Sequence, residues 1–259
     1  TVAVGTIDIS TGEPHVSPPV LGTTTRVSLG VGGAEISDGD AQDPAISADG
    51  TVVAFASHAS DVVVGDANHT DDVFVHDRAT GVTSRVSVAS DGTEADLWSL
   101  DPALSADGRF VAFWSGASNL VAGDTNGSFD VFVHDRSTGV TSRASVASGG
   151  AQADGYSARP AISADGRFVT FDSGAPNLVA GDTNGATDVF VHDRATGVTS
   201  RVSVASDGAQ ADGGGFNPTI SADGRHIAFG SHSTDLVPGD TNGAGDVFVR
   251  ARSTGASTR

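Results

Sequence analysis

One motif recurs four times in this chain at a constant interval, and this periodicity constrains the fold more than any other feature. The string Ser-Ala-Asp-Gly begins at residues 47, 105, 163 and 221, and Asp-Val-Phe-Val begins at 72, 130, 188 and 246, so both recur every 58 residues. Self-similarity at a fixed period is typical of repeat architectures, in which each unit packs against its neighbours. We therefore expect four equivalent structural units.

Each unit has the pattern of four short β-strands. In the second unit, Pro102–Leu104 leads through an Asp-Gly turn into Arg109–Trp114, and Asp130–Asp135 leads through a Thr-Gly turn into Val140–Ala147. Valine, phenylalanine and threonine dominate these runs, no helical period competes with them, and Asp-Gly between two such runs favours a hairpin. A helix-free unit of this length predicts an all-β fold, a β-propeller with one four-stranded blade per unit.

The repeat also predicts how a single domain is divided. We expect blades at residues 43–100, 101–158, 159–216 and 217–259, and a partial repeat at residues 1–42. Thr24–Leu29 matches the fourth strand at Thr83–Val88, whereas the last unit reaches residue 259 where its own fourth strand should begin. We therefore expect the N-terminal strand to close a four-bladed ring, which would hide two sheet edges. A fifth blade that includes residues 1–20 is the alternative.

Composition excludes several classes of function. The chain has 14 basic residues, all arginine, against 32 acidic ones, and its net charge is −18. Such a surface repels phosphate backbones and anionic lipid, so we expect neither nucleic-acid binding nor membrane insertion. No apolar run is long enough to span a bilayer. The absence of cysteine excludes disulfides and thiolate metal sites.

The loop between the second and third strands carries oxygen ligands at the same spacing in every unit. The candidate ligands are Asp66, Asn68 and Asp72; Asp124, Asn126 and Asp130; Asp182, Asn184 and Asp188; and Asp240, Asn242 and Asp246. Oxygens around a sharp turn suit Ca²⁺, and few charges per site predict weak binding, at about 10⁻⁴–10⁻³ M, as in extracellular modules. We therefore predict calcium sites in a secreted or cell-surface protein. A turn in which these side chains bond only to their own backbone is the alternative.

Residues that differ between the units are candidates for recognition of a ligand. Trp98, Tyr156 and Phe216 lie in the segments that join one unit to the next, and Trp114 follows the second-strand phenylalanine. In a propeller, these segments and the loops between the second and third strands open on the same face. Aromatic rings beside acidic and amide groups suit a glycan or protein ligand. The alternative is that the rings fill gaps between blades.

The repeated pattern resembles that of the TolB-like β-propeller family. The resemblance is carried by Pro, Ile-Ser-Ala-Asp-Gly-Arg, an apolar run that ends in Phe, and then Asp-Val-Phe-Val-His-Asp-Arg, Thr-Gly and Thr-Ser-Arg. It covers residues 43–259 well and residues 1–42 weakly. Alanine stands here where the family's Ser-Pro-Asp-Gly turn usually has proline. The resemblance implies a propeller that serves as a binding platform, a structural module or, occasionally, an enzyme.

Motifs for catalysis are missing from the sequence. It has no Gly-x-Ser-x-Gly elbow, phosphate-binding loop or His-Glu-x-x-His string. Nearly every ionisable candidate recurs in each unit, whereas a catalytic site usually needs one unrepeated constellation. We predict a calcium-stabilised binding module that is not an enzyme. A purely structural or assembly propeller and a polysaccharide-acting lyase or hydrolase are the alternatives.

Overall fold

The computed structural model describes residues 6–7, 14–15, 22–252 and 257–258. These residues form four antiparallel sheets of four strands each, and the strands of a sheet lie side by side in chain order. The sheets consist of β3 (Ala41–Ile46), β4 (Val52–Ser57), β5 (Asp72–Asp77) and β6 (Val82–Arg85); β7 (Ser99–Leu104), β8 (Phe110–Ser115), β9 (Asp130–Asp135) and β10 (Val140–Arg143); β11 (Ser157–Ile162), β12 (Phe168–Ser173), β13 (Asp188–Asp193) and β14 (Val198–Arg201); and β15 (Phe216–Ile220), β16 (His226–Ser231), β17 (Asp246–Ala251) and β18 (Ser257–Thr258). Ahead of them, β1 (Thr6–Ile7) pairs with β2 (Pro14–His15), and η1 (Val31–Gly33) is a short 3₁₀ helix. Among the described residues, no helix is long and apolar enough to cross a membrane.

The Ser-Ala-Asp-Gly string forms the turn between the first two strands of each sheet. In the second blade, Ser105 Oγ donates a hydrogen bond of 2.6 Å to Asp107, and the backbone N–H of Arg109 donates one of 3.0 Å to the same carboxylate. Gly108 has a φ of 67°, a left-handed conformation that glycine adopts without strain. Local sequence therefore explains why this hairpin forms at the same point in every unit.

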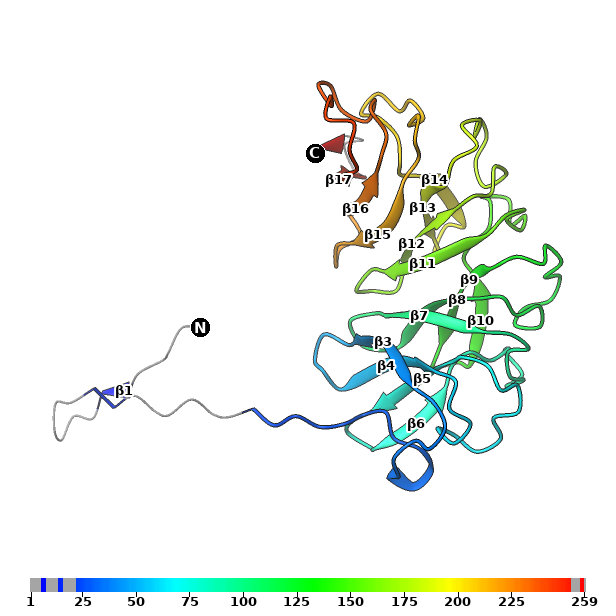
Figure 1. Ribbon diagram of the computed structural model, residues 1–259, viewed down its shortest axis with the longest axis vertical. Helices are drawn as coiled ribbons and strands as arrows, with labels where there is room; N and C mark the ends of the chain where they lie inside the picture. Colours follow the sequence, from blue (N-terminus) through cyan, green and yellow to red (C-terminus); the bar gives the residue numbers. More distant parts are fainter. Residues whose placement is uncertain (1–5, 8–13, 16–21, 253–256, 259) are drawn as a thin grey trace.

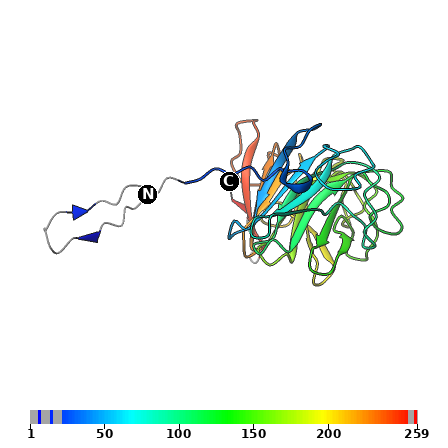
Figure 2. The ribbon, with the colours of Figure 1, turned by 90° about the horizontal axis from the view of Figure 1, so that it is seen from below.

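The four sheets follow one another along an arc, with β3–β6 at one end and β15–β18 at the other (Figure 1). Seen from below, they stand beside one another like blades (Figure 2). Neighbouring innermost strands, in the order β3, β7, β11 and β15, contact each other, and residues from all four strands line one central cavity. This arrangement confirms the expected all-β propeller with four blades.

Apolar side chains between neighbouring blades form the core. Val131 and Val133 of β9 pack with Val169 and Phe171 of β12, and all four side chains are fully buried. The first and second blades, and the third and fourth, bury residues from the same repeat positions. Burial of such a side chain contributes about 1.5–3 kcal/mol. The strand sequences therefore specify not only each sheet but also how it packs on the next.

The last blade differs from the expectation that Thr24–Leu29 completes it. Its fourth strand is β18, which pairs with β17. Leu29 instead forms an isolated bridge with Glu35, and this bridge has the same form as the one between Val88 and Glu94 after the first blade. The end of the N-terminal segment, Val27–Leu29, therefore has the form of an inter-blade connection, because the residues that it matches, Val86–Val88, follow the end of β6. The rest of the expected partial repeat, at residues 1–5, 8–13 and 16–21, lies outside the described residues.

Candidate functional site

Each innermost strand is interrupted by a β-bulge at the same point. The pairing register shifts within β3, β7, β11 and β15 around a dipeptide that ends in proline. The residue before this proline has a positive φ in every blade: Asp43 (51°), Asp101 (48°), Arg159 (52°) and Asn217 (50°). We call these four the axial residues. Non-glycine residues adopt such angles at an energetic cost, and bulges re-aim side chains, so the same strain recurs four times for a common reason.

Three of the axial residues, Asp43, Asp101 and Arg159, line the central cavity, whose volume is about 390 Å³, and Asn217 precedes its lining residue Pro218. Its lining consists of Asp43, Pro44, Asp101, Pro102, Arg159, Pro160 and Pro218. The prolines are the same in all four blades, whereas the residue before them is Asp in the first two blades, Arg in the third and Asn in the fourth. The scaffold of the cavity is thus repeated while its chemistry is not.

The charges of the axial residues divide the cavity into an acidic and a basic side. Asp43 and Asp101 lie close together on neighbouring blades, and burial together with the charge of Asp101 raises the pKa of Asp43. Arg159 is on the third blade, and its Nη1 donates a hydrogen bond of 3.0 Å to Asp172 of β12. The cavity can therefore attract a cation on one side and an anion on the other.

Asp172 links the third and fourth blades beside this cavity. Its Oδ2 accepts hydrogen bonds from Arg159 Nη1 and from the backbone N–H of Asn217, both of 3.0 Å. The side chain is fully buried, and burial raises its pKa. Its Oδ1 has no hydrogen-bond partner among the residues that the structure describes. Asp172 therefore holds two axial residues in place from inside the fold.

The predicted ligand residues Trp98 and Trp114 come together around Phe129, and we call these three residues the aromatic cluster. The ring centroids of Trp114 and Phe129 are 4.8 Å apart in an edge-to-face arrangement, and those of Trp98 and Phe129 are 5.8 Å apart. Trp114 Nε1 donates a hydrogen bond of 2.7 Å to Asp101 Oδ2, so the cluster reaches the axial cavity. Trp98 is 47% exposed, and with Leu97 it borders a hollow of about 190 Å³.

The other two predicted ligand residues lie on the third and fourth blades. Tyr156 has the repeat position of Trp98, is 39% exposed, and forms a hydrogen bond between its hydroxyl and Thr187 Oγ1. Phe216 is half-buried, and its ring centroid lies 5.4 Å from that of His232. Tyr156 therefore offers a ring to a ligand, whereas Phe216 mainly fills space beside β16.

The expected meeting of connections and loops at one face is visible in backbone hydrogen bonds. The N–H of Ser99 and that of Ser157, at the ends of two connections, donate bonds of 2.7 Å to the carbonyls of Asp71 and Phe129, at the ends of two loops. Sequence reasoning missed Phe129 and the axial residues. A signal was present, because an unvarying proline preceded by Asp, Asp, Arg and Asn recurs at residues 44, 102, 160 and 218.

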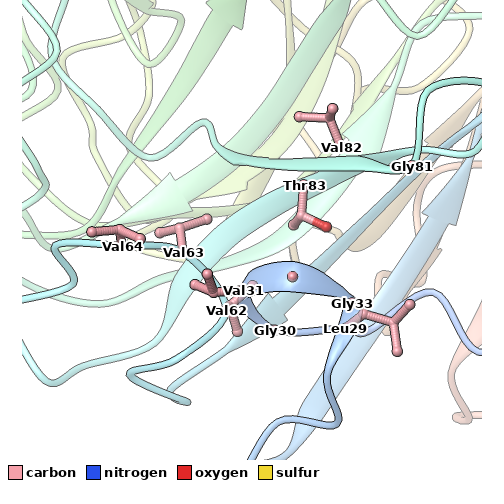
Figure 3. Close-up of a pocket in the computed structure, with 11 residues that line it drawn as sticks. Leu29, Gly30, Val31, Gly33, Val62, Val63, Val64, Gly81, Val82 and Thr83 are labelled. Carbon is pink, nitrogen blue, oxygen red and sulfur yellow. The ribbon is translucent and has the colours of Figure 1, made fainter.

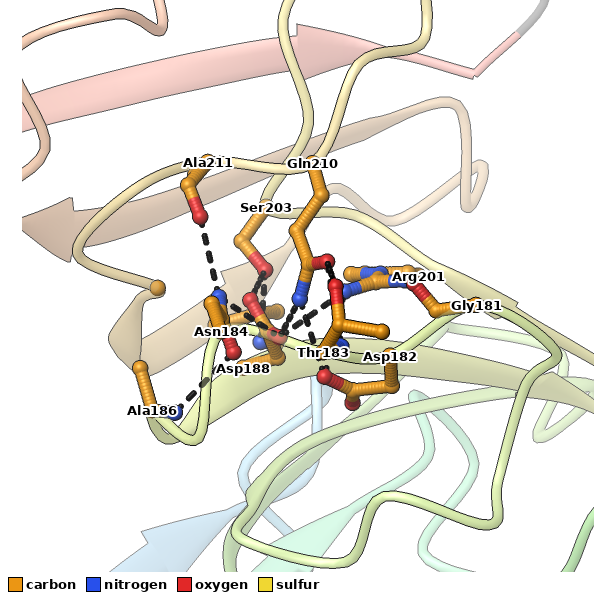
Figure 4. Close-up of polar contacts among 12 residues, drawn as sticks. Gly181, Asp182, Thr183, Asn184, Ala186, Asp188, Arg201, Ser203, Gln210 and Ala211 are labelled. Carbon is orange, nitrogen blue, oxygen red and sulfur yellow. Dashed lines mark hydrogen bonds and ion pairs between the residues drawn. The ribbon is translucent and has the colours of Figure 1, made fainter.

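The predicted metal ligands of the loops take part in hydrogen-bonded networks (Figure 4). In the third blade, Asn184 Oδ1 accepts the N–H of Ala186, and Asn184 Nδ2 donates to the carbonyl of Ala211, both at 2.9 Å. Asp188 forms an ion pair with Arg201 in which Nη1 and Oδ2 are 3.1 Å apart. The same contacts join Asn68, Asp72 and Arg85, and Asn126, Asp130 and Arg143, to their surroundings. In the fourth blade, Asn242 donates to Asp246 at 3.1 Å.

The loop of the first blade carries one more carboxylate than the next two. Glu94 stands where the second and third blades have Gln152 and Gln210. Oxygens of Asp66, Asp72 and Glu94 lie within 4.8 Å of one another, and no other cluster of this kind occurs in the described part of the chain. These oxygens are hard ligands of the type that Ca²⁺ prefers.

Arg85 only partly compensates for the charge of this cluster. It forms a close ion pair with Glu94, while its nitrogens are 3.3 Å from Asp72 Oδ2 and 3.7 Å from Asp66 Oδ2. Burial raises the pKa of Asp72 to about 6. The side chain of Asp66 is 1% exposed, and neither of its oxygens has a hydrogen-bond partner among the described residues. The cluster therefore retains buried negative charge.

A further cavity, of about 440 Å³, lies between the N-terminal segment and the first blade (Figure 3). Its side chains are those of Leu29, Val31, Val62, Val63, Val64, Val82 and Thr83, together with four glycines. This lining has no charged group and one hydroxyl, so it offers apolar contact but little means of orienting a polar ligand. The charged axial cavity is the better candidate for specific recognition.

Comparison with known proteins is informative about the fold. A search of known protein families finds no match, and no curated protein sequence matches the chain. TolB from Acinetobacter baumannii is similar in structure, with a TM-score of 0.51 and 18% identity over 85% of this chain and 43% of that protein. A putative TolB from Agrobacterium tumefaciens gives 0.54 and 17% over 89% and 67%, and dipeptidyl peptidase 4 from Porphyromonas gingivalis gives 0.52 and 15% over 87% and 33%. The chain therefore spans less than half the length of the first of these proteins.

Proposed function

We propose that this chain, which has the fold of TolB-like β-propellers, is a binding module for a protein ligand that presents a basic side chain to the axial cavity. One observation carries the proposal: four structurally equivalent, strained positions hold Asp43, Asp101, Arg159 and Asn217, and the first three of these residues line one cavity. A purely structural repeat has no need to vary the same position from blade to blade. Strain that persists at such a position is typical of functional sites.

The acidic side of the cavity determines the ligand charge that we propose. Asp43 and Asp101 are neighbours, and the net charge of the chain is −18, so an ammonium or guanidinium group is attracted over a distance and then held by two carboxylates. A neutral glycan offers no such group. The aromatic cluster adds an exposed ring at Trp98 for an apolar neighbour of the basic residue.

We propose that the role of this site is binding and not catalysis. The residues that line the axial cavity are prolines, two aspartates and an arginine. This set offers charge for recognition but no serine or histidine for a nucleophile and base pair. The two carboxylates are the observation that favours the second candidate, a polysaccharide-acting enzyme, because paired carboxylates serve in glycoside hydrolysis. Release of new reducing or unsaturated ends from a polysaccharide panel would support that candidate.

A peptide array tests the proposed ligand. It should hold peptides with lysine or arginine beside aliphatic or aromatic residues, and the same peptides with glutamate in place of the basic residue, next to a glycan array. We expect the protein to bind a subset of the basic peptides only. Asp43→Asn and Asp101→Asn should each weaken this binding at least tenfold, and Trp98→Ala and Tyr156→Ala should weaken it without a change in melting temperature.

The control is Glu35→Gln, which removes one negative charge from a 72% exposed side chain that is paired with Arg26 outside the axial site. This variant should bind like the original protein. If binding falls equally in Glu35→Gln and Asp43→Asn, the attraction of the basic peptide comes from the net charge of the protein and not from the axial cavity. Arrays that stay blank would favour the structural alternative, and binding of neutral glycans that Asp43→Asn leaves intact would favour a glycan ligand.

We also propose that calcium binds the first-blade loop at Asp66, Asp72 and Glu94. Support comes from the three gathered carboxylates and from the buried oxygens of Asp66 that lack hydrogen-bond partners. A divalent cation would satisfy these oxygens once Arg85 moves aside. In the other loops calcium remains a prediction, and a comparison of melting temperatures in calcium and in EDTA tests it. Weak calcium sites suit millimolar calcium outside the cell, which is the basis for proposing a secreted or cell-surface location.

A further inference from the structure

The end of the fourth blade exposes residues that the other blades bury. Val247 and Val249 of β17 are 68% and 37% exposed, whereas the valines at the same positions of β5, β9 and β13 are at most 3% exposed. Those buried valines pack against the following blade. The fourth blade therefore presents an apolar strip of the kind that the next blade covers elsewhere. We call this surface, with His226 and Ala222, the trailing face.

The first blade exposes the complementary side of the same contact. Its innermost strand, β3, is exposed or half-buried along its whole length, unlike β7 and β11. Ile46 is 62% exposed, whereas Ile162 at the same position of the third blade is 9% exposed. The internal equivalents are covered by the preceding blade. We call this surface, with Ala48, Gly50 and Arg78, the leading face.

A series of backbone hydrogen bonds connects the blades in one direction. The N–H of Ala48 donates to the carbonyl of Ala106, Ala106 donates to Ala164, and Ala164 donates to Ala222, each at 2.9 Å. Within the described residues, the N–H of Ala222 and the carbonyl of Ala48 have no part in this series. The trailing face thus keeps the donor, and the leading face keeps the acceptor, of one more bond of the same type.

A stacking contact between neighbouring blades also has its two partners divided between the trailing face and the leading face. Arg252 of the fourth blade lies over the ring of Phe168 of the third, with its guanidinium carbon 3.9 Å from the ring centroid. The position of Phe168 is occupied by His226 on the trailing face, and that of Arg252 by Arg78 on the leading face. Arg78 is exposed and already donates a hydrogen bond of 2.6 Å to the carbonyl of Gly50. It therefore has the orientation needed to stack on a ring.

We propose that the trailing face of one chain docks on the leading face of a second copy, head to tail. The second copy is the occupant because it carries all the complementary groups: an apolar strand at Ile46, an acceptor at Ala48 and a guanidinium at Arg78. The contact continues an interface that the chain already makes three times within itself. Such a heterologous contact buries exposed apolar surface, and it forms rings or open chains according to its geometry.

Complementation between two variants tests the proposal. Ile46→Asp blocks the leading face, and Val247→Asp blocks the trailing face; both side chains are exposed, so both variants should fold, as circular dichroism will show. Light scattering over a dilution series should find at least twice the mass of one chain for the original protein. Each variant alone should have the mass of one chain. Their equimolar mixture should have twice that mass, because one functional face of each remains.

Val198→Asp is the matched control, since Val198 is 47% exposed on the outer strand of the third blade, away from both faces. It should associate like the original protein. A single-chain mass for the original protein at every concentration overturns the proposal. Association of Ile46→Asp by itself would also overturn the proposal, because it would mean contact between two trailing faces. A mixture in which the two folded variants fail to combine would overturn it as well.

Discussion

The indole nitrogen of Trp114 donates a hydrogen bond of 2.7 Å to Oδ2 of Asp101. This contact joins the aromatic cluster to an axial carboxylate, because Trp114 also packs edge-to-face on Phe129. The hydrogen bond fixes the orientation of the Asp101 carboxylate beside Asp43. Recognition of a charged group and of an apolar neighbour can therefore be coupled through one side chain.

Binding of a basic peptide should weaken as the pH falls. Burial, and then the charge of Asp101, raise the pKa of Asp43 above its usual 3.8. A cation binds the ionised carboxylate, so protonation of Asp43 removes part of the attraction, and the affinity should drop at a higher pH than an ordinary aspartate would give. Fluorescence titrations at a series of pH values measure this. The profile should be flatter for Asp43→Asn, and a pH-independent affinity in the original protein would contradict the role of Asp43.

Much of the fold could be predicted from the sequence, because turn and strand signals coincide in each repeat. The Ser-Ala-Asp-Gly turn and the Asp-Val-Phe-Val strand are local patterns, and their recurrence identifies blades without any knowledge of long-range contacts. The closing strand could not be predicted in this way. Thr24–Leu29 matches residues of which the last three, Val86–Val88, belong to a connection and not to a strand. Sequence similarity therefore did not distinguish a strand from a connection between blades.

The axial site was harder to predict than the blades. A β-bulge and a left-handed φ at Asp43 or Arg159 depend on how two strands pair, and no periodic pattern records them. The aromatic residues could be found because they stand at positions that differ between the repeats. The difference in exposure between Trp98 and Phe216 could not be predicted, because it depends on which residues pack against each ring.

Calcium should stabilise the protein through Glu94. At a tenfold excess over its dissociation constant, a ligand that binds only the folded state adds about 1.4 kcal/mol. We therefore expect the melting temperature to rise by a few degrees in millimolar calcium relative to EDTA, with little effect of magnesium. Glu94→Gln gives the first loop the side chain of Gln152 and Gln210 and should remove the part of the rise that comes from the first loop. Equal melts of the original protein in calcium and EDTA would exclude these sites.

Proline in the second Ser-Ala-Asp-Gly turn should destabilise the protein more than proline in the fourth. Ala106→Pro removes the N–H that bonds to the carbonyl of Ala164, whereas Ala222→Pro removes an N–H that has no part in the series of bonds between the blades. The effect on the unfolded chain is the same in both variants and cancels. The difference should be about 1 kcal/mol in the free energy of unfolding. Urea denaturation at low protein concentration measures it, and equal stabilities would show that these bonds contribute nothing.

Stability in acid should depend on two arginine–aspartate pairs. Arg109 binds Asp135 through two hydrogen bonds of 2.8 and 2.7 Å, and Arg167 binds Asp193 with the same distances. These bonds, first among the causes, hold the pKa of both carboxyls well below the usual 3.8. The folded state therefore stays ionised where the unfolded chain takes up protons, so the stabilisation is fully present above pH 3.8 and is lost as the pH falls below it.

Asp135→Asn should lower the free energy of unfolding at neutral pH and flatten its decline in acid, as measured by urea denaturation at a series of pH values. The first blade provides the control, because Thr51 stands where Arg109 does and Asp77 has no such arginine–carboxylate pair among the described residues. Asp77→Asn should therefore have a smaller effect on both the neutral value and the slope, coming from the turn that Asp77 caps by accepting the N–H of Thr80 at 2.9 Å. If the two variants lose the same stability with the same pH dependence, the arginine pairs are screened by solvent and only the caps contribute.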